Sequence, residues 1–232
     1  MYTFLPLQAK NIIFLVTDIS FSAISMLDTD LLSAVKTGDA SAVQRTLSTG
    51  QASLEEVDEQ GRTALIYACE IGHGGIVRLL CDQGADVDAA NNTGFSGLMY
   101  AAHHGHIDVI DILLSNNADC NCQVRNGETA LMYAIREGHT DVINMLLDRG
   151  ANIHVRNKQG MSALFLAAKH GHTEVVRRLL KEKHADIHAH THTGSQPLHV
   201  AAKYGHRGNL GKQMFLIVSQ LKQFLCMDLN LT

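Results

Sequence analysis

Apolar side chains recur along most of the chain at the spacing of one face of an α-helix. In the stretch "GHTDVINMLLDRGANI", which begins at Gly138, four apolar residues hold positions i, i+1, i+4 and i+5: Val142, Ile143, Leu146 and Leu147. The intervening residues are mostly polar, so the pattern predicts a short amphipathic helix with one buried stripe. The same pattern returns in "GHGGIVRLLCDQGADV", "GHIDVIDILLSNNADC" and "GHTEVVRRLLKEKHADI".

A shorter apolar cassette precedes each of these helices: "GRTALIYACEI", "GFSGLMYAAHH", "GETALMYAIRE" and "GMSALFLAAKH", with a fifth, "GSQPLHVAAKY", further on. A hydroxyl residue near the start of the first four can cap a helix, and Pro197 suits the first turn of the fifth. The capping residues are Thr63, Ser96, Thr129 and Ser162. A glycine after each cassette can adopt a positive φ and end the helix. Each unit is therefore predicted to hold two helices, followed by an extended, hairpin-like finger such as "DRGANIHVRNKQG".

The cassettes recur at a nearly fixed period. Their leading glycines are separated by 33, 33, 33 and 34 residues: Gly61, Gly94, Gly127, Gly160 and Gly194. One unit cannot bury its own apolar stripe, whereas units stacked side by side form a continuous core. We therefore expect an all-α solenoid of stacked helix-turn-helix units.

This pattern resembles the ankyrin-repeat family over about residues 27–206. The resemblance is carried by the Gly-x-Thr/Ser-x-Leu opening, the Ala-x-x-Gly-His middle and the Val-Ile/Val-x-x-Leu-Leu second half. It implies a divergent N-terminal capping repeat at 27–60, repeats at 61–93, 94–126, 127–159 and 160–193, and an incomplete repeat at 194–206. Residues 1–25 are expected to be a weakly ordered extension, and residues 207–232 an atypical C-terminal segment.

A histidine follows the glycine that ends each cassette: His73, His106, His139, His172 and His206. His139 and Asp141 could be taken for a catalytic pair. However, an active site is needed once, whereas this histidine recurs in every unit, and the aspartate is missing from "HGGIV". The resemblance implies that the histidines form hydrogen bonds that brace the loops between repeats. Asp141 is expected to interact favourably with the N-terminal end of the second helix.

The chain departs from the family at two places. Tyr67, Tyr100 and Tyr133 occupy a position where the family prefers leucine. We expect them to pack in the core with their hydroxyls reaching water, the alternative being a ligand-binding face. After His206 the second helix is replaced by a segment with an amphipathic stripe: Met214, Ile217, Val218, Leu221 and Leu225. This segment is expected either to cap the open end of the stack or to form a partly disordered tail.

Composition narrows the class of protein. The 232 residues are 46% apolar and 18% charged with a net charge of −4, which is ordinary for a globular protein and shows no general attraction to nucleic acid or membranes. Five cysteines without paired spacing favour reduced intracellular thiols. The N-terminus lacks a basic region and a long apolar run, so we expect no secretion signal. These features predict a cytoplasmic monomer, with the nucleus as the alternative location, and no cofactor.

No enzyme motif is present: the chain has no phosphate-binding glycine loop, nucleophile elbow or HExxH. The resemblance instead implies a non-enzymatic module that binds a protein partner on a concave surface of finger tips and first-helix ends. Carried over position by position, the candidate partner-binding residues are His103, His104, Arg125, Arg136, Glu137, Arg156, Lys158, Lys169, His170, His190, His192, Lys203 and Tyr204.

Charge on this surface changes sign along the chain. Residues 28–61 hold seven acidic and two basic side chains, whereas residues 156–212 hold ten basic and three acidic ones and eight of the 14 histidines. The simplest interpretation is a solvated face. The more specific hypothesis is a partner whose acidic segment lies along the basic half. Such a contact would affect the association rate and specificity more than the affinity.

Other functions remain open as alternatives. The stack could be the targeting or regulatory subunit of a larger enzyme or signalling complex. His188, His190 and His192 alternate and could share one face of a strand, which raises metal binding or a response to pH. Against metal, only three ligands are evident, so we assign no metal site. Nucleic-acid binding by the basic half lacks a continuous stripe with stacking aromatics.

Overall fold

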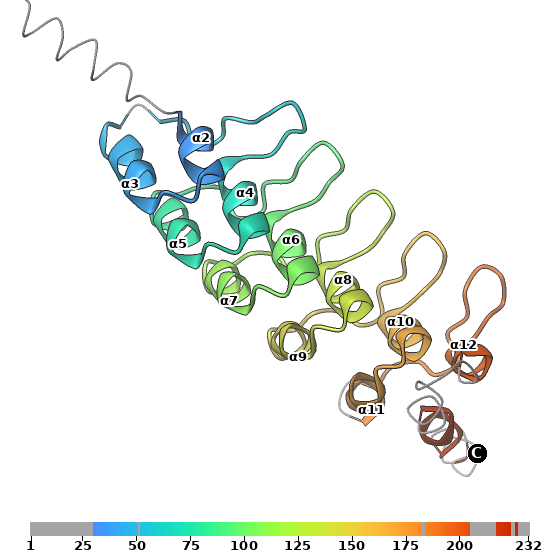
Figure 1. Ribbon diagram of the computed structural model, residues 1–232. Helices are drawn as coiled ribbons and strands as arrows, with labels where there is room; N and C mark the ends of the chain where they lie inside the picture. The colour runs from blue at the N-terminus through green and yellow to red at the C-terminus, as the bar shows by residue number, and fades with distance from the viewer. Residues whose placement is uncertain (1–29, 51, 182–183, 205–216, 224–225, 227–232) are drawn as a thin grey trace, which may run out of the picture.

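The computed structural model describes residues 30–50, 52–181, 184–204, 217–223 and 226, and these form a row of stacked helical pairs (Figure 1). The first helices of the pairs are α2 (Leu31–Lys36), α4 (Ala64–Ile71), α6 (Gly97–His104), α8 (Ala130–Glu137), α10 (Ala163–His170) and α12 (Pro197–Tyr204). The second helices are α3 (Ala40–Ser48), α5 (Gly74–Asp82), α7 (Ile107–Ser115), α9 (Thr140–Asp148) and α11 (Thr173–Lys181). The predicted all-α repeat solenoid is confirmed.

Most of the predicted helix starts are present. The side-chain oxygens of Thr63, Thr129 and Ser162 each accept a hydrogen bond from the backbone N–H three residues ahead. Such caps satisfy N–H groups that have no partner within the helix. Ser96 departs from the prediction, because its side chain makes no capping bond and its backbone instead forms an antiparallel bridge with Ala90 in the finger. Pro197 is the first residue of α12.

Glycine ends the first helix for two reasons, which Gly105 illustrates. Its φ of 79° lies in the left-handed region, which disfavours residues with a Cβ atom. A Cβ atom at this position would also lie 2.8 Å from Nδ1 of His139 in the next repeat. The turn therefore depends on glycine both for its backbone conformation and for the close approach of a neighbouring ring.

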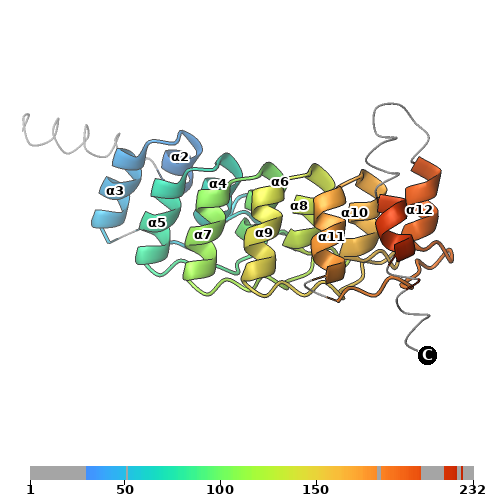
Figure 2. The ribbon, with the colours of Figure 1, turned by 90° about the horizontal axis from the view of Figure 1, so that it is seen from below.

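The core runs through the stack without interruption. Ala68, Ala101, Ala134 and Ala167 are fully buried on successive first helices, where a small side chain lets neighbouring helices pack closely. The second helices lie side by side in a parallel row (Figure 2), and the predicted stripe of α9 is buried throughout. Each pair thus covers the apolar side of the one before it.

The fingers between the pairs are linked to one another through the backbone. The N–H groups of Asn92, Lys158 and His192 donate to carbonyl oxygens in the preceding finger, at N···O distances between 2.8 and 3.0 Å. Within the described residues, Ala90 and Ser96 form the bridge noted above, and no longer strand is present. The fingers are therefore turns held by hydrogen bonds rather than regular hairpins.

A further helical stretch, residues 217–223, lies at the C-terminal end of the stack. Ile217 and Leu221 have no exposed surface and belong to the same buried cluster as Val200 and Ala201 of α12. Two other members of the predicted stripe, Met214 and Leu225, lie outside the described residues, as do His206 and the N-terminal extension 1–25.

Candidate functional site

The fingers project from the side of the stack that the first helices form, away from the row of second helices (Figure 1). This surface carries every candidate partner-binding residue. The finger members Arg125, Arg156, Lys158, His190 and His192 are exposed, as are Glu137, Lys203 and Tyr204 at the helix ends. Their hydrogen bonds and ion pairs determine which of them are available to a partner.

The repeated histidines do not gather at one site. Nε2 of His106 lies 3.1 Å from the carbonyl oxygen of Glu70, and Nε2 of His139 lies 2.9 Å from that of His103. A carbonyl oxygen only accepts, so in both cases Nε2 carries the proton and donates. These two histidines link adjacent repeats as the resemblance implies.

The other copies differ in detail. Nδ1 of His73 accepts a hydrogen bond from the N–H of Ile76 and so caps its own helix, α5. Nε2 of His172 is buried without a hydrogen-bond partner among the described residues, but the backbone of Ile135 in the preceding repeat interacts with this ring and opposes the lowering of its pKa by burial. Among the described copies, His106 and His139 thus form the predicted inter-repeat bond, and His73 caps its own helix instead.

The tyrosine hydroxyls bond to the fingers. Tyr67 donates from its hydroxyl to Oδ2 of Asp58 over 2.7 Å, and the hydroxyl of Tyr100 accepts from Nδ2 of Asn91 over 3.2 Å. Tyr133 is almost fully buried, with its ring centroid 4.9 Å from that of Phe95. Tyr133 belongs to the buried core and Tyr67 packs against it, as predicted. Tyr67 and Tyr100 are partly exposed, and contact of their hydroxyls with water stays a prediction.

At the N-terminal end of the surface, Arg62 joins two carboxylates. Its guanidinium lies 3.1 Å from Asp58 and 3.1 Å from Glu70, and it stacks 4.1 Å from the centre of the Tyr67 ring. Burial would raise the pKa of Asp58, but hydrogen bonds from the Arg62 backbone, Tyr67 and the Arg62 side chain outweigh it and hold that pKa far below its usual range. This cluster was not predicted from the sequence.

In the middle of the surface, Arg136 forms an ion pair with Glu128, whose side chain is only 3% exposed. The same carboxylate accepts from Nδ2 of Asn157 at 3.2 Å and from Nδ2 of Asn126 at 3.0 Å. Burial would raise the pKa of Glu128, but the hydrogen bonds and charge of Arg136, with Asn157 and Tyr133, lower it. The charge of Arg136 therefore already balances a buried carboxylate, and its contact with an acidic partner stays a prediction.

Other candidates have weaker internal partners. Arg156 lies 3.7 Å from Asp186 and 3.5 Å from the carbonyl oxygen of His190, and Nδ1 of His103 lies 3.5 Å from Glu137. These pairs are largely exposed to solvent and therefore contribute little to stability. In the part of the chain that the structure describes, four candidate cations form no ion pair: Arg125, Lys158, Lys169 and Lys203.

Two of the helix-end histidines, His104 and His170, have pKa values below the ordinary value. Burial, followed by the nearby rings of His103 and His106, lowers the pKa of His104. Burial and the charge of Lys169 likewise lower the pKa of His170. His188, His190 and His192 are exposed, and the described residues contain no group of three His, Cys, Asp or Glu side chains placed to hold a metal ion.

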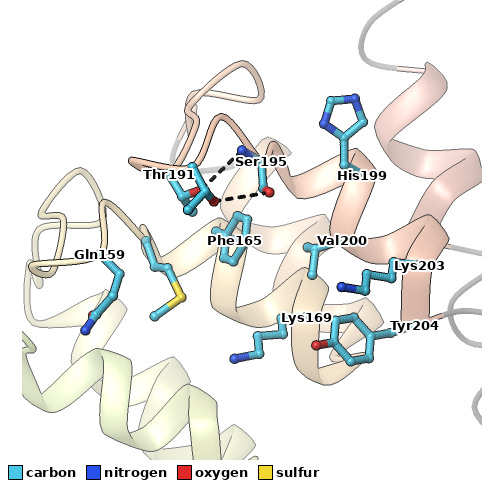
Figure 3. Close-up of a pocket in the computed structure, with 11 residues that line it drawn as sticks. Gln159, Phe165, Lys169, Thr191, Ser195, His199, Val200, Lys203 and Tyr204 are labelled. Carbon is cyan, nitrogen blue, oxygen red and sulfur yellow. Dashed lines mark hydrogen bonds between the residues drawn. The ribbon is translucent and has the colours of Figure 1, made fainter.

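A cavity of about 430 Å³ opens between α10, α12 and the last two fingers (Figure 3). Three of the candidate residues, Lys169, Lys203 and Tyr204, lie at one end of it. The rest of the wall is formed by Gln159, Met161, Phe165, Thr191, Thr193, Ser195, His199 and Val200. Most of these residues were not singled out from the sequence.

Comparison with known proteins agrees with the fold. A family model described as ankyrin repeats (3 copies) matches residues 31–124, and one described as ankyrin repeats (many copies) matches residues 131–180 and 164–215. The chain belongs to the ankyrin-repeat family. It is also 40% identical over 53 residues to a protein of Dictyostelium discoideum named acyl-CoA-binding domain-containing protein 6 homolog. That match spans 23% of this chain and 18% of the relative's length.

Ankyrin repeats are generally protein–protein interaction modules, and the family is typically non-enzymatic. The family therefore implies protein partners for this chain. Among the described residues, no helix has the length and apolar character needed to cross a membrane.

Proposed function

We propose that this protein is a non-enzymatic scaffold or adaptor module that binds an acidic segment of a protein partner across its fingers and first-helix ends. The observation that carries the proposal is that four candidate cations on this surface form no ion pair with the described residues: Arg125, Lys158, Lys169 and Lys203. They belong to successive repeats on one surface, so an extended acidic chain could meet them in turn.

The charge distribution favours one orientation of such a partner. The N-terminal end of the surface carries Asp58, Glu59 and Glu70, of which Asp58 and Glu70 pair with Arg62. The C-terminal half has a basic excess. An acidic segment is attracted to the second region and repelled by exposed carboxylates in the first, which raises the association rate and selects the orientation.

The test is a binding titration with a fluorescent peptide rich in glutamate. The variant Arg125→Glu/Lys158→Glu should weaken binding by about tenfold or more, since it reverses two charges on the finger tips. The control is Arg78→Glu, which makes one such reversal at an exposed position of α5, in the row of second helices. Affinity should also fall between low and physiological salt. Equal loss in both variants, or no effect of salt, would refute the proposed surface.

A second candidate role is that of a targeting arm for a larger complex. The match to 18% of a longer protein named for a different domain favours it, because in that protein the matched segment is a small part of the whole. Affinity capture with wild type beside Arg125→Glu/Lys158→Glu tests this role. Loss of an enzyme or channel component in the variant would support it, and an unchanged set of captured proteins would refute it. Either role is expected of a cytoplasmic or nuclear monomer, which sedimentation of the purified chain can check.

A further inference from the structure

The column of tyrosines on the first helices ends before the last two repeats. Successive repeats hold Tyr67, Tyr100, Tyr133, Leu166 and Val200 at this position. In the first two, the ring extends to the finger that precedes its helix, where its hydroxyl bonds to a side chain nine residues earlier, Asp58 or Asn91. In the last repeat the corresponding residues are Val200 and Thr191, so no ring crosses from the helix to the finger.

The cavity described above lies at this place. Phe165, Met161 and Val200 provide apolar surface, and Figure 3 shows Phe165 between the finger residues Thr191 and Ser195 and the helix-end residues Lys169 and Lys203. Its volume of about 430 Å³ is within the range of pockets that hold small ligands. Val200 in the wall of this cavity is smaller than the tyrosine that three earlier repeats hold at the same position.

The two ends of the cavity differ in chemistry. At the finger end, the hydroxyl of Thr191 accepts from the N–H of Ser195 over 3.1 Å and lies 2.9 Å from that of Thr193, so these groups largely bond to one another. At the helix end, Lys169 and Lys203 form no ion pair with any described residue, and Nζ of Lys203 lies 5.9 Å from the centre of the Tyr204 ring. An apolar group therefore fits the centre, and a carboxylate fits the helix end.

We propose that this cleft holds a bulky apolar side chain of the partner peptide, and that Lys169 and Lys203 bind a carboxylate on the adjacent residue. The inference rests on the proposed function, which it deepens by naming a sequence feature of the acidic partner: an aromatic or large aliphatic residue next to aspartate or glutamate. At many interfaces, a side chain buried in a pocket contributes most of the affinity. Charge-assisted hydrogen bonds from the two lysines hold the carboxylate of the adjacent peptide residue.

The decisive variant is Val200→Tyr. It restores the residue that the fold already holds at Tyr67, Tyr100 and Tyr133, and Thr191 places a hydroxyl where Asp58 and Asn91 bond to their tyrosines. The new ring should occupy the cleft without lowering the melting temperature. Val200→Ile, which leaves most of the space open, is the matched control. If Val200→Tyr destabilises the chain, Lys169→Gln/Lys203→Gln tests the same cleft from its exposed end.

The probes are three fluorescent peptides that share a glycine, serine and glutamate background: one with a central Phe-Glu pair, one with Ala-Glu and one with Phe-Gln. Wild type and Val200→Ile should bind the Phe-Glu peptide about tenfold more tightly than the other two. Val200→Tyr should abolish the preference for phenylalanine, and the double lysine variant should abolish the preference for Phe-Glu over Phe-Gln.

The experiment distinguishes an error in the proposed cleft from an error in the proposed acidic-partner surface. If all three peptides bind equally well and binding still depends on Arg125 and Lys158, the cleft is refuted and the proposed function stands. If Val200→Tyr remains folded and keeps the full preference for phenylalanine, the cleft is likewise refuted. If no peptide binds at any salt concentration, both proposals fall.

Discussion

Nε2 of His139 donates a hydrogen bond to the main-chain carbonyl oxygen of His103, 2.9 Å away and 36 residues earlier in the chain. The bond spans the boundary between two repeats, and the ring that makes it lies against Gly105, where a Cβ atom would not fit. His106 makes the same bond to Glu70 one repeat earlier. A residue pair that first suggests catalysis, His139 with Asp141, therefore contains a structural link between repeats.

Replacing His139 by alanine should lower the free energy of unfolding by about 1–3 kcal/mol, because the carbonyl of His103 loses its donor in a partly buried place. Chemical denaturation measures the change. His154→Ala is the control, since His154 is exposed on a finger and should be close to neutral. Equal stability of His139→Ala and wild type would contradict the role of this bond.

Gly105→Ala and Gly150→Ala separate two costs of replacing glycine. Both residues have positive φ, at 79° and 87°, so alanine at either position is destabilised by the left-handed backbone conformation. At Gly105 the new Cβ also meets the His139 ring at 2.8 Å, whereas nothing lies within 4 Å at Gly150. Gly105→Ala should therefore be less stable than Gly150→Ala by about 1–3 kcal/mol. A smaller or reversed difference in denaturation midpoints would show that the ring moves away at little cost.

Arg136→Ala should destabilise the fold by about 1–3 kcal/mol, because it leaves the buried Glu128 carboxylate without its charged donor. The comparison is Arg149→Ala, which removes an ion pair with Asp111 that is about half exposed on both sides and should cost less than about 1 kcal/mol. Thermal melts of the two variants distinguish a structural arginine from a surface one. If the costs are equal, Arg136 returns to the set of residues available to a partner.

Stability should also fall in acid. The folded-state pKa values of Glu128 and Asp58 lie below their ordinary values, so the unfolded chain binds protons first as pH falls. Their contribution is complete above about pH 5 and is lost as pH falls through the folded-state values. Glu128→Gln should be less stable than wild type near neutral pH and should lose less stability on acidification. Glu174→Gln, on the exposed side of α11, is the control and should follow the wild-type curve.

The C-terminal helical stretch is expected to protect the last repeat. Leu221 has no exposed surface, so Leu221→Ala should cost about 2–5 kcal/mol. Lys222→Ala, at the exposed neighbouring position, should be close to neutral. Deleting residues 212–232 should lower the melting temperature as well. An unchanged melt after deletion would show that the stack does not need this segment as a cap.

Much of the fold could be predicted from local patterns alone. The 33-residue period, the hydroxyl and glycine residues at the helix ends, and the stripe of α9 each reflect interactions within a few turns of chain, where spacing specifies geometry. A structural role for the repeated histidines could be predicted, because a residue that recurs in every unit is expected to stabilise the contact between units. The sequence also located the basic half of the surface, since charge can be counted without coordinates.

Which charges are available could be decided only by the tertiary structure. Arg136 occupies a helix-end position that the family exposes, but Arg136, Asn157 from the following finger and Asn126 from the preceding repeat converge on the buried carboxylate of Glu128. No sequence period predicts this, because the residue after the leading glycine is Arg62, Phe95, Glu128, Met161 or Ser195 in successive repeats. The cleft beside Val200 likewise depends on stacking, because residues of α10 and of the finger before it line it together with residues of α12. Local periodicity determines the helices and their order, while side chains brought together from neighbouring repeats determine the charges and the space that a partner meets.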